Sequence, residues 1–362
     1  MAIWKIDELG EFVTLKRGYD LPQQKRKNGE IPIFSSSGVT GTHNEAMVEA
    51  PGVITGRYGT IGEVFFAKTS FWPLNTTLYV ENFHENDEKF VYYFLKTLEW
   101  KKFASASAVP GINRNTVHKE IVRFPDFETQ QKIASVLSTI DKKIAVNKAI
   151  NDNLEQQAAA LFSSLYNRSN TEVRYTDLIQ ILGGGTPKTG ETAYWNGNIA
   201  FFTPKDVGTP YTFITEKTIT EEGLSHCNSR LYPVNTVFVT ARGTVGKVGL
   251  SGIPMAMNQS CYALVGKETH QLLVYFYTLK AVDRLKHKAS GAVFDAITTR
   301  DFDSEQIMKL SDDDAKAFLC VAEPMFQEML NNSIENLRLS TLRDFLLPKL
   351  MSGEIDVSSV QL

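Results

Sequence analysis

The chain has 362 residues, of which 43% are hydrophobic and 11% aromatic, and its formal net charge is −3. This composition can bury substantial cores and excludes a disordered protein. No apolar run approaches the roughly 20 residues that span a bilayer, and MAIWKIDELGEF at the start lacks the apolar core of a signal peptide. Three widely spaced cysteines, Cys227, Cys261 and Cys320, predict neither a disulfide framework nor a CxxC metal site. We therefore expect a protein of the reducing cytoplasm.

The charge is nearly balanced along most of the chain. Residues 1–125 and 171–310 each carry one more basic than acidic side chain, and residues 126–170 are neutral. Residues 311–362 carry nine acidic and four basic side chains. No segment is therefore a general polyanion binder, and contacts to nucleic acid would depend on local clusters or on a partner protein.

Residues 1–125 are expected to form a mixed α/β globule. Segments rich in β-branched and aromatic residues between Gly and Pro turns predict strands at 53–55, 63–66 and 78–80. A short helix is expected at 88–102.

Residues 126–170 carry a stripe with the alternating spacing of four and three that is typical of a heptad repeat. The stripe predicts a long helix, roughly 50 Å in length at 1.5 Å per residue. Two asparagines, Asn147 and Asn151, fall within the apolar seam. The seam comprises Ile133, Leu137, Ile140, Ile144, Asn147, Asn151, Leu154, Ala158, Leu161 and Leu165.

Residues 171–310 are expected to form a second globule of the same kind, with strands at 237–240 and 262–265 and a helix at 269–288. Three strings of the first globule recur here. NGEIPIF (28–34) returns as NGNIAFF (196–202), VITGRYGTIG (53–62) as FVTARGTVG (238–246), and LNTTLY (74–79) as MNQSCY (257–262). The offset grows from 168 to about 185, so the second copy should contain a longer insertion before its Arg-Gly-Thr turn.

Residues 311–362 repeat the long helix and end in a short tail. Adding 185 to each seam position of the first helix gives a second seam, in which only Arg343 is a clear misfit and Asn332 and Asn336 replace the first asparagine pair. Pro324 should kink this helix or mark its true start, and Pro348 should distort or end its last turn. The seam comprises Phe318, Ala322, Met325, Met329, Asn332, Asn336, Leu339, Arg343, Leu346 and Leu350.

These repeats predict a duplicated domain with pseudo-two-fold symmetry, in which the two helices pair in an antiparallel coiled coil. Buried asparagines cost stability unless they find partners, and their best-attested use is to fix register. The alternative is that each helix packs only on its own globule.

Catalytic motifs are absent from the sequence. It has no GxxxxGK[ST] phosphate loop, GxSxG elbow or HExxH zinc helix. A nuclease-like pattern can be assembled only from Pro125-Asp126 and Asp141-Lys142-Lys143, whose second part lies on the long helix. The six scattered histidines are best interpreted as surface residues.

Clusters of basic and polar residues recur in both globules and are candidates for DNA contact, although a lysine pair is more often a solvated surface. Arg57 and Arg242 each follow an apolar strand and precede a Gly-Thr-(Ile/Val)-Gly turn. Arginine there could read guanine or clamp a phosphate; the alternative is a tight turn with a locally paired arginine. The candidate DNA-binding residues are Lys16, Arg17, Lys25, Arg26, Lys27, Ser36, Arg57, Thr60, Lys101, Lys102, Asn113, Arg114, Lys205, Arg242, Thr244, Lys286, Lys288, Thr299 and Arg300.

The sequence resembles the specificity (S) subunits of type I restriction–modification systems over essentially its whole length. The resemblance rests on the GTIG and GTVG turns, the following Leu-Asn and Met-Asn motifs, FETQQKIASVLSTIDKKIAVNKAINDNLEQQAAALFSSLY, and the ending FLLPKLMSGEIDV. The second helix departs from the family pattern, because DDDAKAFLCVAEP replaces the usual Glu-Gln-(polar)-Ile run.

The resemblance implies an α+β fold with two target-recognition domains (1–125 and 171–310) and two conserved spacer helices (126–170, and 311–362 with its tail). It implies a non-catalytic subunit that reads a bipartite double-stranded DNA target and docks two methyltransferase subunits. No cofactor or metal is expected in this chain, since S-adenosylmethionine, ATP and Mg would be used by the methyltransferase and restriction subunits. The alternatives are a stand-alone DNA nuclease or modification enzyme, and a coiled-coil adaptor without a DNA role.

Overall fold

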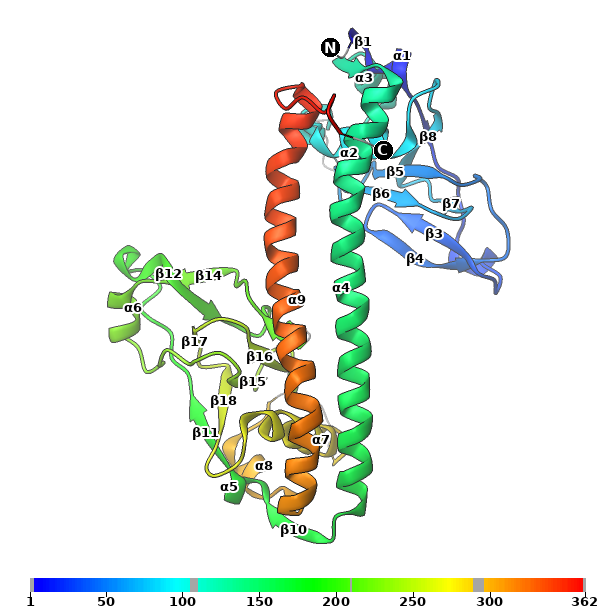
Figure 1. Ribbon diagram of the computed structural model, residues 1–362. Helices are drawn as coiled ribbons and strands as arrows, with labels where there is room; N and C mark the ends of the chain where they lie inside the picture. Colours follow the sequence, from blue (N-terminus) through cyan, green and yellow to red (C-terminus); the bar gives the residue numbers. More distant parts are fainter. Residues whose placement is uncertain (1–2, 105–109, 209, 289–295, 361–362) are drawn as a thin grey trace. The chain divides into compact units, whose positions relative to one another are not determined.

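The computed structural model describes residues 3–104, 110–208, 210–288 and 296–360 (Figure 1). The chain forms two compact units. Unit 1 comprises Met1–Val146 and Asn336–Leu362, and unit 2 comprises Asn147–Glu335.

Unit 1 contains an antiparallel ribbon, a four-stranded sheet and a three-stranded sheet. The ribbon is β1 (Trp4–Glu8) with β9 (Ile121–Pro125); the larger sheet has the order β2 (Thr14–Arg17), β8 (Thr77–Asn82), β5 (Gly52–Gly56), β6 (Val64–Ala67). The smaller sheet has the order β4 (Gly38–His43), β3 (Ile31–Ser35), β7 (Trp72–Pro73). The shorter helices are α1 (Leu9–Phe12), η1 (Gln23–Lys25), α2 (Glu88–Thr97), η2 (Trp100–Phe103) and α3 (Arg114–His118).

Unit 2 has the same plan. Its ribbon is β10 (Thr171–Arg174) with β19 (Gln306–Lys309), and its larger sheet has the order β11 (Ile179–Gly183), β18 (Cys261–Gly266), β15 (Val237–Thr240), β16 (Val248–Ser251), β13 (Tyr211–Thr212). Its smaller sheet has the order β14 (Lys217–Ile219), β12 (Trp195–Phe202), β17 (Met255–Met257). The shorter helices are α5 (Tyr175–Leu178), η3 (Thr192–Tyr194), α6 (Glu221–Ser225), α7 (Gln271–Lys288) and α8 (Thr299–Asp303).

The repeat seen in the sequence is therefore a repeat of topology. In each smaller sheet the central strand pairs parallel with the last strand and antiparallel with the other. The predicted insertion is confirmed: β3 and β5 are joined by residues 36–51, whereas β12 and β15 are joined by residues 203–236, which include β13, β14 and α6.

Burial explains why the predicted strands form. Every residue of β5 and of β15 is buried, as expected for central strands covered on both faces. Aromatic rings fill the core of unit 1, where Phe124 stacks on Phe12 with ring centroids 4.3 Å apart. They also fill the core of unit 2, where Phe162 stacks on Phe276 at 5.0 Å.

Two long helices, α4 (Phe127–Arg168) and α9 (Asp312–Ser352), contribute to both units, and within each unit their segments pair with each other (Figure 1). In unit 2, Asn147 Nδ2 donates to Glu335 Oε2 at 2.6 Å, and Asn332 Nδ2 donates to Asn151 Oδ1 at 3.0 Å. The numbering thus rises on one helix as it falls on the other, so the pairing is antiparallel. Every residue of both predicted seams is buried or half-buried.

The prolines of α9 do not limit it. The alternative that Pro324 marks the start of the helix was wrong, since α9 begins at Asp312, and Pro348 does not end it, since it continues to Ser352. Each proline removes a hydrogen bond to the carbonyl four residues earlier. Those carbonyls belong to Cys320 and Asp344, which are exposed, so that water can satisfy them.

Candidate nucleic-acid interface

In unit 1, the loops after β2, β5 and β7 are joined to the segment before α3 by backbone hydrogen bonds. Tyr19 N donates to Pro73 O at 2.8 Å, and Arg57 N donates to Thr76 O at 2.8 Å. Ile112 N in turn donates to Arg57 O at 3.0 Å. We call the resulting surface the first loop cluster, which consists of residues 17–20, 35–38, 56–62, 73–77 and 110–114.

The turn between β5 and β6 brings three predicted residues together. Gly59 has φ +76°, a left-handed conformation that favours glycine, and Ser36 Oγ lies 3.3 Å from where a Cβ of Gly59 would be. Thr60 is exposed in the same turn. Arg57 is half-buried, and its Nε donates to Ile112 O at 3.2 Å. Ser36, Arg57 and Thr60 thus lie around one turn.

Unit 2 joins the corresponding loops with the same bonds. Gly185 N donates to Met257 O at 3.1 Å, and Ala241 N donates to Ser260 O at 2.8 Å. Ile297 N donates to Ala241 O at 2.9 Å. We call this surface the second loop cluster, which consists of residues 183–186, 203–206, 241–247, 257–260 and 296–300.

The turn between β15 and β16 likewise brings predicted residues together. Arg242 and Thr244 are exposed on either side of Gly243, whose φ is +79°. Pro204 Cβ lies 4.0 Å from where a Cβ of Gly243 would be, which puts the loop of Lys205 beside this turn.

The two predicted arginines do not occupy matching positions, contrary to the alignment suggested by the sequence. Arg57 and Tyr58 donate their backbone N–H groups to one carbonyl at 2.8 and 3.2 Å, and Ala241 and Arg242 donate to the corresponding carbonyl at the same two distances. Arg57 therefore matches Ala241, and Tyr58 matches Arg242. The Thr-x-Arg string is shifted by one residue along an otherwise identical strand and turn.

Two predicted lysines form matching ion pairs within their own units. Lys102 Nζ lies 2.5 Å from Glu120 Oε1, and Lys288 Nζ lies 2.5 Å from Glu305 Oε2. Glu305 is 1% exposed, so Lys288 compensates a buried carboxylate. These contacts give Lys102 and Lys288 structural roles.

Three further lysines also have partners. Lys16 Nζ lies 2.5 Å from Glu81 Oε1, and this hydrogen bond raises the pKa of Lys16. Lys286 Nζ donates to a backbone carbonyl of the second loop cluster at 2.6 Å, which fixes the turn after Arg242. Lys205 lies 3.3 Å from Glu216, but both side chains are exposed and the pair can open at little cost.

Of the other predicted basic residues in unit 1, Arg17 and Arg114 belong to the first loop cluster and the rest lie outside it. Lys25, Arg26 and Lys27 are beside β4, at the end of the β3–β4 hairpin opposite its turn, where the backbone of Lys27 bonds to His43 at 3.1 Å. Arg17 is exposed and weakly paired to an aspartate at 3.7 Å, and Lys101 is exposed on η2.

The starts of α3 and α8 adjoin the two loop clusters. Asn113 caps α3 by accepting a backbone N–H at 3.0 Å, and Arg114 follows it in an exposed position. Thr298 caps α8, followed by Thr299 and Arg300, which are also exposed. Ile112 N donates to Arg57 O, and Ile297 N donates to Ala241 O, which places these two helix starts beside the glycine turns.

The seam asparagines form hydrogen bonds between the two helices. Asn332 bonds to Asn151, whereas its equivalent position in the first helix is Asn147. Asn151 receives the Asn332 amide and itself donates to Met329 O and Ser333 Oγ, both at 3.2 Å. Asn147 bonds to Glu335, while Asn336 is half-buried in unit 1. The bond to Asn151 satisfies the buried Asn332 amide, which is consistent with a role in setting helix register.

The nuclease-like carboxylates have structural roles. Asp126 accepts the backbone N–H groups of Thr129 at 3.0 Å and Ile3 at 2.9 Å and thereby caps α4. Asp141 accepts from Arg343 at 2.8 Å and from Tyr93 at 2.6 Å. The two carboxylates are separated by about four helical turns, roughly 22 Å, and no group of three potential metal ligands occurs among the described residues.

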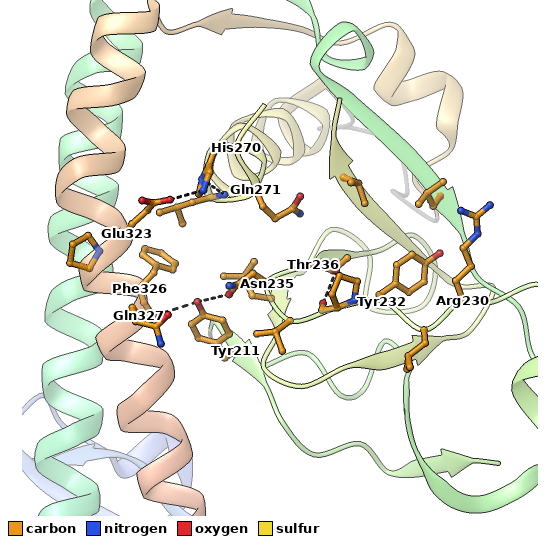
Figure 2. Close-up of a pocket in the computed structure, with 18 of the residues that line it drawn as sticks. Tyr211, Arg230, Tyr232, Asn235, Thr236, His270, Gln271, Glu323, Phe326 and Gln327 are labelled. Carbon is orange, nitrogen blue, oxygen red and sulfur yellow. Dashed lines mark hydrogen bonds and ion pairs between the residues drawn. The ribbon is translucent and has the colours of Figure 1, made fainter. Parts of the chain in front are cut away.

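A pocket of about 880 Å³ lies in unit 2 beside α9 (Figure 2). Figure 2 shows His270 turned toward Glu323, with Nε2 and Oε1 2.5 Å apart, and the Tyr211 hydroxyl donating to Asn235 Oδ1 at 2.9 Å. Burial raises the pKa of Tyr211, so this phenol stays protonated. Two pairs of the labelled polar groups thus satisfy each other, His270 with Glu323 and Tyr211 with Asn235.

Tyr58 is the residue of the loop clusters that sequence reasoning missed. Its ring lies beneath the Arg57 guanidinium, with Arg57 Cζ 4.5 Å from the ring centroid. The signal was present in the sequence, because RYG and RG differ by one residue before the shared glycine. Aligning Arg57 with Arg242 left Tyr58 without a counterpart in the second copy.

Several comparisons with known proteins agree. The family described as type I restriction modification DNA specificity domain matches residues 1–156 and 167–309. The HindI specificity subunit of Haemophilus influenzae is 25% identical over 345 residues, which cover 72% of this chain and 75% of that protein. The EcoR124I/EcoR124II specificity subunit of Escherichia coli is 29% identical over 204 residues, which cover 52% of this chain and 50% of that protein.

A crystal structure of a type I restriction–modification S subunit from M. genitalium has the same fold. It superposes with a TM-score of 0.66 at 17% identity and covers 97% of this chain and 96% of that one. No helix in the described part of the chain has the length and apolarity needed to cross a membrane. The predicted fold, two mixed α/β domains with two long antiparallel helices, is thus confirmed, and the chain belongs to the family of type I restriction–modification DNA specificity subunits.

Proposed function

We propose that this chain gives a type I restriction–modification complex its DNA sequence specificity, with each loop cluster reading one half of a bipartite double-stranded target. The observation that carries the proposal is the duplication of one fold that presents the same five loops twice. In both copies, cationic and hydroxyl side chains gather around a glycine turn: the half-buried Arg57 with the exposed Thr60 in the first, and the exposed Arg242 and Thr244 in the second. Such groups bond to phosphates and to base edges.

The paired helices are proposed to set the gap between the half-sites and to dock two methyltransferase subunits. Contiguous exposed apolar surface favours contact with other proteins, and the long helices carry several exposed apolar side chains. Val146 and Phe345 are 53% and 58% exposed in unit 1, and Val321 is 45% exposed in unit 2. The acidic surplus of residues 311–362 favours a protein partner over DNA for this surface.

The chemistry is proposed to belong to the partners. Methyl transfer from S-adenosylmethionine would be performed by the methyltransferase subunits, and ATP- and Mg-dependent cleavage by the restriction subunits. Asp126 and Asp141, the carboxylates of the nuclease-like pattern, are committed to a helix cap and an ion pair in this chain.

The test is to map DNA methylation in cells that express the methyltransferase partner with this chain, without it, and with it restored. We expect one split motif with a fixed unread gap, absent without the chain and recovered on complementation. Methylation that persists without the chain would contradict the proposal. So would DNA cutting or methylation by the purified chain alone, which the enzyme alternative requires.

A further inference from the structure

Tyr58 and Arg242 are the two versions of one backbone position. Each residue forms an isolated β-bridge to the segment on its far side, Tyr58 with Gly111 and Arg242 with Ala296. Each directly precedes a glycine with a left-handed φ, +76° in the first copy and +79° in the second. The backbone therefore offers both side chains from the same point of the same turn.

In unit 1 this position holds a braced aromatic ring. The ring lies so close to Gly111 that any side chain there would collide with it. The Arg57 guanidinium also stacks on this ring, with Cζ 4.5 Å from the ring centroid, while Arg57 Nε is anchored to Ile112 O at 3.2 Å. Arg57 is thus engaged twice, and it presents Tyr58 rather than itself.

In unit 2 the same position holds an unbraced cation. Arg242 is exposed, and its side chain has no partner among the described residues. Ala241, which replaces Arg57, is 3% exposed and too short to stack on anything. Ala296 carries a Cβ where Gly111 has none, which leaves no room for a ring in the Tyr58 pose. The Arg242 guanidinium is free to form the bidentate pair with guanine O6 and N7.

From these contacts we infer that Tyr58 and Arg242 are specificity-determining residues of opposite half-sites, and that Arg57 is a positioning residue for Tyr58. The inference rests on the proposed function. Arg242 selects guanine in the half-site read by unit 2. Tyr58 packs its ring against a thymine methyl in the half-site read by unit 1, because an aromatic edge offers an apolar contact and no bidentate fork.

The experiment uses the full chain in complex with its methyltransferase partner and measures methylation of a library in which each target position is randomised. Arg242→Ala should reduce the preference for guanine at one position of one half-site by about tenfold to a hundredfold. Arg242→Lys should reduce it similarly, because lysine keeps the charge but lacks the fork. Tyr58→Ala should relax a thymine preference in the other half-site only.

Two conservative variants serve as controls. Tyr58→Phe keeps the ring and should keep the thymine preference. Arg57→Lys keeps a cation near the ring and should disturb that preference less than Arg57→Ala, which in turn should disturb it less than Tyr58→Ala.

Three results would overturn the inference while leaving the proposed function intact. The first is that the Tyr58 and Arg242 variants alter the same half-site. The second is that Arg242→Lys discriminates like the unaltered chain, which would make Arg242 a phosphate contact. The third is a split motif whose base preferences none of the variants changes. Loss of the proposed function itself would instead appear as methylation that does not depend on the chain at all.

Discussion

Asp141 on α4 and Arg343 on α9 form an ion pair at 2.8 Å in unit 1, and Tyr93 donates to the same carboxylate at 2.6 Å. The helix positions of unit 2 that correspond to Asp141 and Arg343 hold Phe326 and Ala158, both buried. Burial alone would lower the pKa of Arg343, but its hydrogen bonds to Asp141 and Asp344 raise it. The misfit residue of the heptad pattern, Arg343, is therefore satisfied by an acidic partner on the other helix.

Unit 2 stabilises its helix segments with aromatic rings instead. Phe318 contacts Phe276 with ring centroids 5.2 Å apart and Phe162 at 5.4 Å, and Phe276 also contacts Phe326 at 5.7 Å. A duplicated fold has thus kept its helix register while replacing one complete set of contacts by another. Complete replacement matters, because a buried charge without its partner would be strongly destabilising.

The largest predicted effect comes from breaking the aromatic set. Phe318→Ala should lower the free energy of unfolding of unit 2 by about 3 to 5 kcal/mol, because Phe318 is fully buried and the cavity would not close. Urea denaturation combined with hydrogen exchange of the two units would measure this loss. Phe345→Ala on the same helix is the matched control and should change stability by less than about 0.5 kcal/mol. Equal losses for both variants would contradict the comparison.

A smaller effect is expected from the ion pair of unit 1. Arg343→Ala should cost about 1.5 to 3 kcal/mol, because it leaves the half-buried Asp141 with only the Tyr93 hydrogen bond. The double variant Asp141→Asn with Arg343→Met should be less destabilised than the sum of its singles, with a coupling of about 0.5 to 3 kcal/mol. Asp344→Asn, which alters an exposed partner of the same arginine, should cost under about 0.5 kcal/mol. Strict additivity in this double-mutant cycle would show that the pair contributes nothing.

Much of the fold could be predicted from the sequence because its signals are local and repeated. The strand at 237–240 is β15 residue for residue, and the helix expected at 269–288 begins two residues later, at Gln271. Pro324 was harder to interpret, since a proline inside a helix is tolerated when the carbonyl that it frees faces water, and sequence alone does not show exposure.

The loop clusters could be predicted only as a list of residue types. Ser36, Arg57 and Thr60 do lie around one turn. Lys25 and Lys27, by contrast, lie beside β4 and outside the first loop cluster. Lys102 and Lys288 have acidic partners 17 or 18 positions away in sequence, which no local pattern reveals. The shift that pairs Tyr58 with Arg242 depends on backbone hydrogen bonds, and string matching favoured the wrong register.

The smallest predicted effect sharpens the same comparison at the helix starts. Asp126 caps α4, whereas Ser311, the corresponding residue, caps α9 by accepting the Asp314 N–H at 3.1 Å. The backbone hydrogen bonds from Thr129 and Ile3 hold the pKa of Asp126 below that of a free aspartate. A depressed folded-state pKa contributes stability that is present above the unfolded pKa, about 3.9, and is lost as pH falls through the folded value.

Asp126→Asn should therefore cost about 0.5 to 1 kcal/mol at pH 7, since one of the two accepting oxygens becomes an amide and solvent screens the remaining difference. The difference from the unaltered chain should shrink as pH falls below about 4, because the carboxyl group is then protonated as well. Ser311→Ala should cost a similar amount that does not shrink through Ser311 itself, because a hydroxyl does not titrate in this range. Unfolding measured at pH 7 and pH 3 would decide the matter. A deficit for Asp126→Asn that is undiminished in acid would show that the charge of this cap does not stabilise α4.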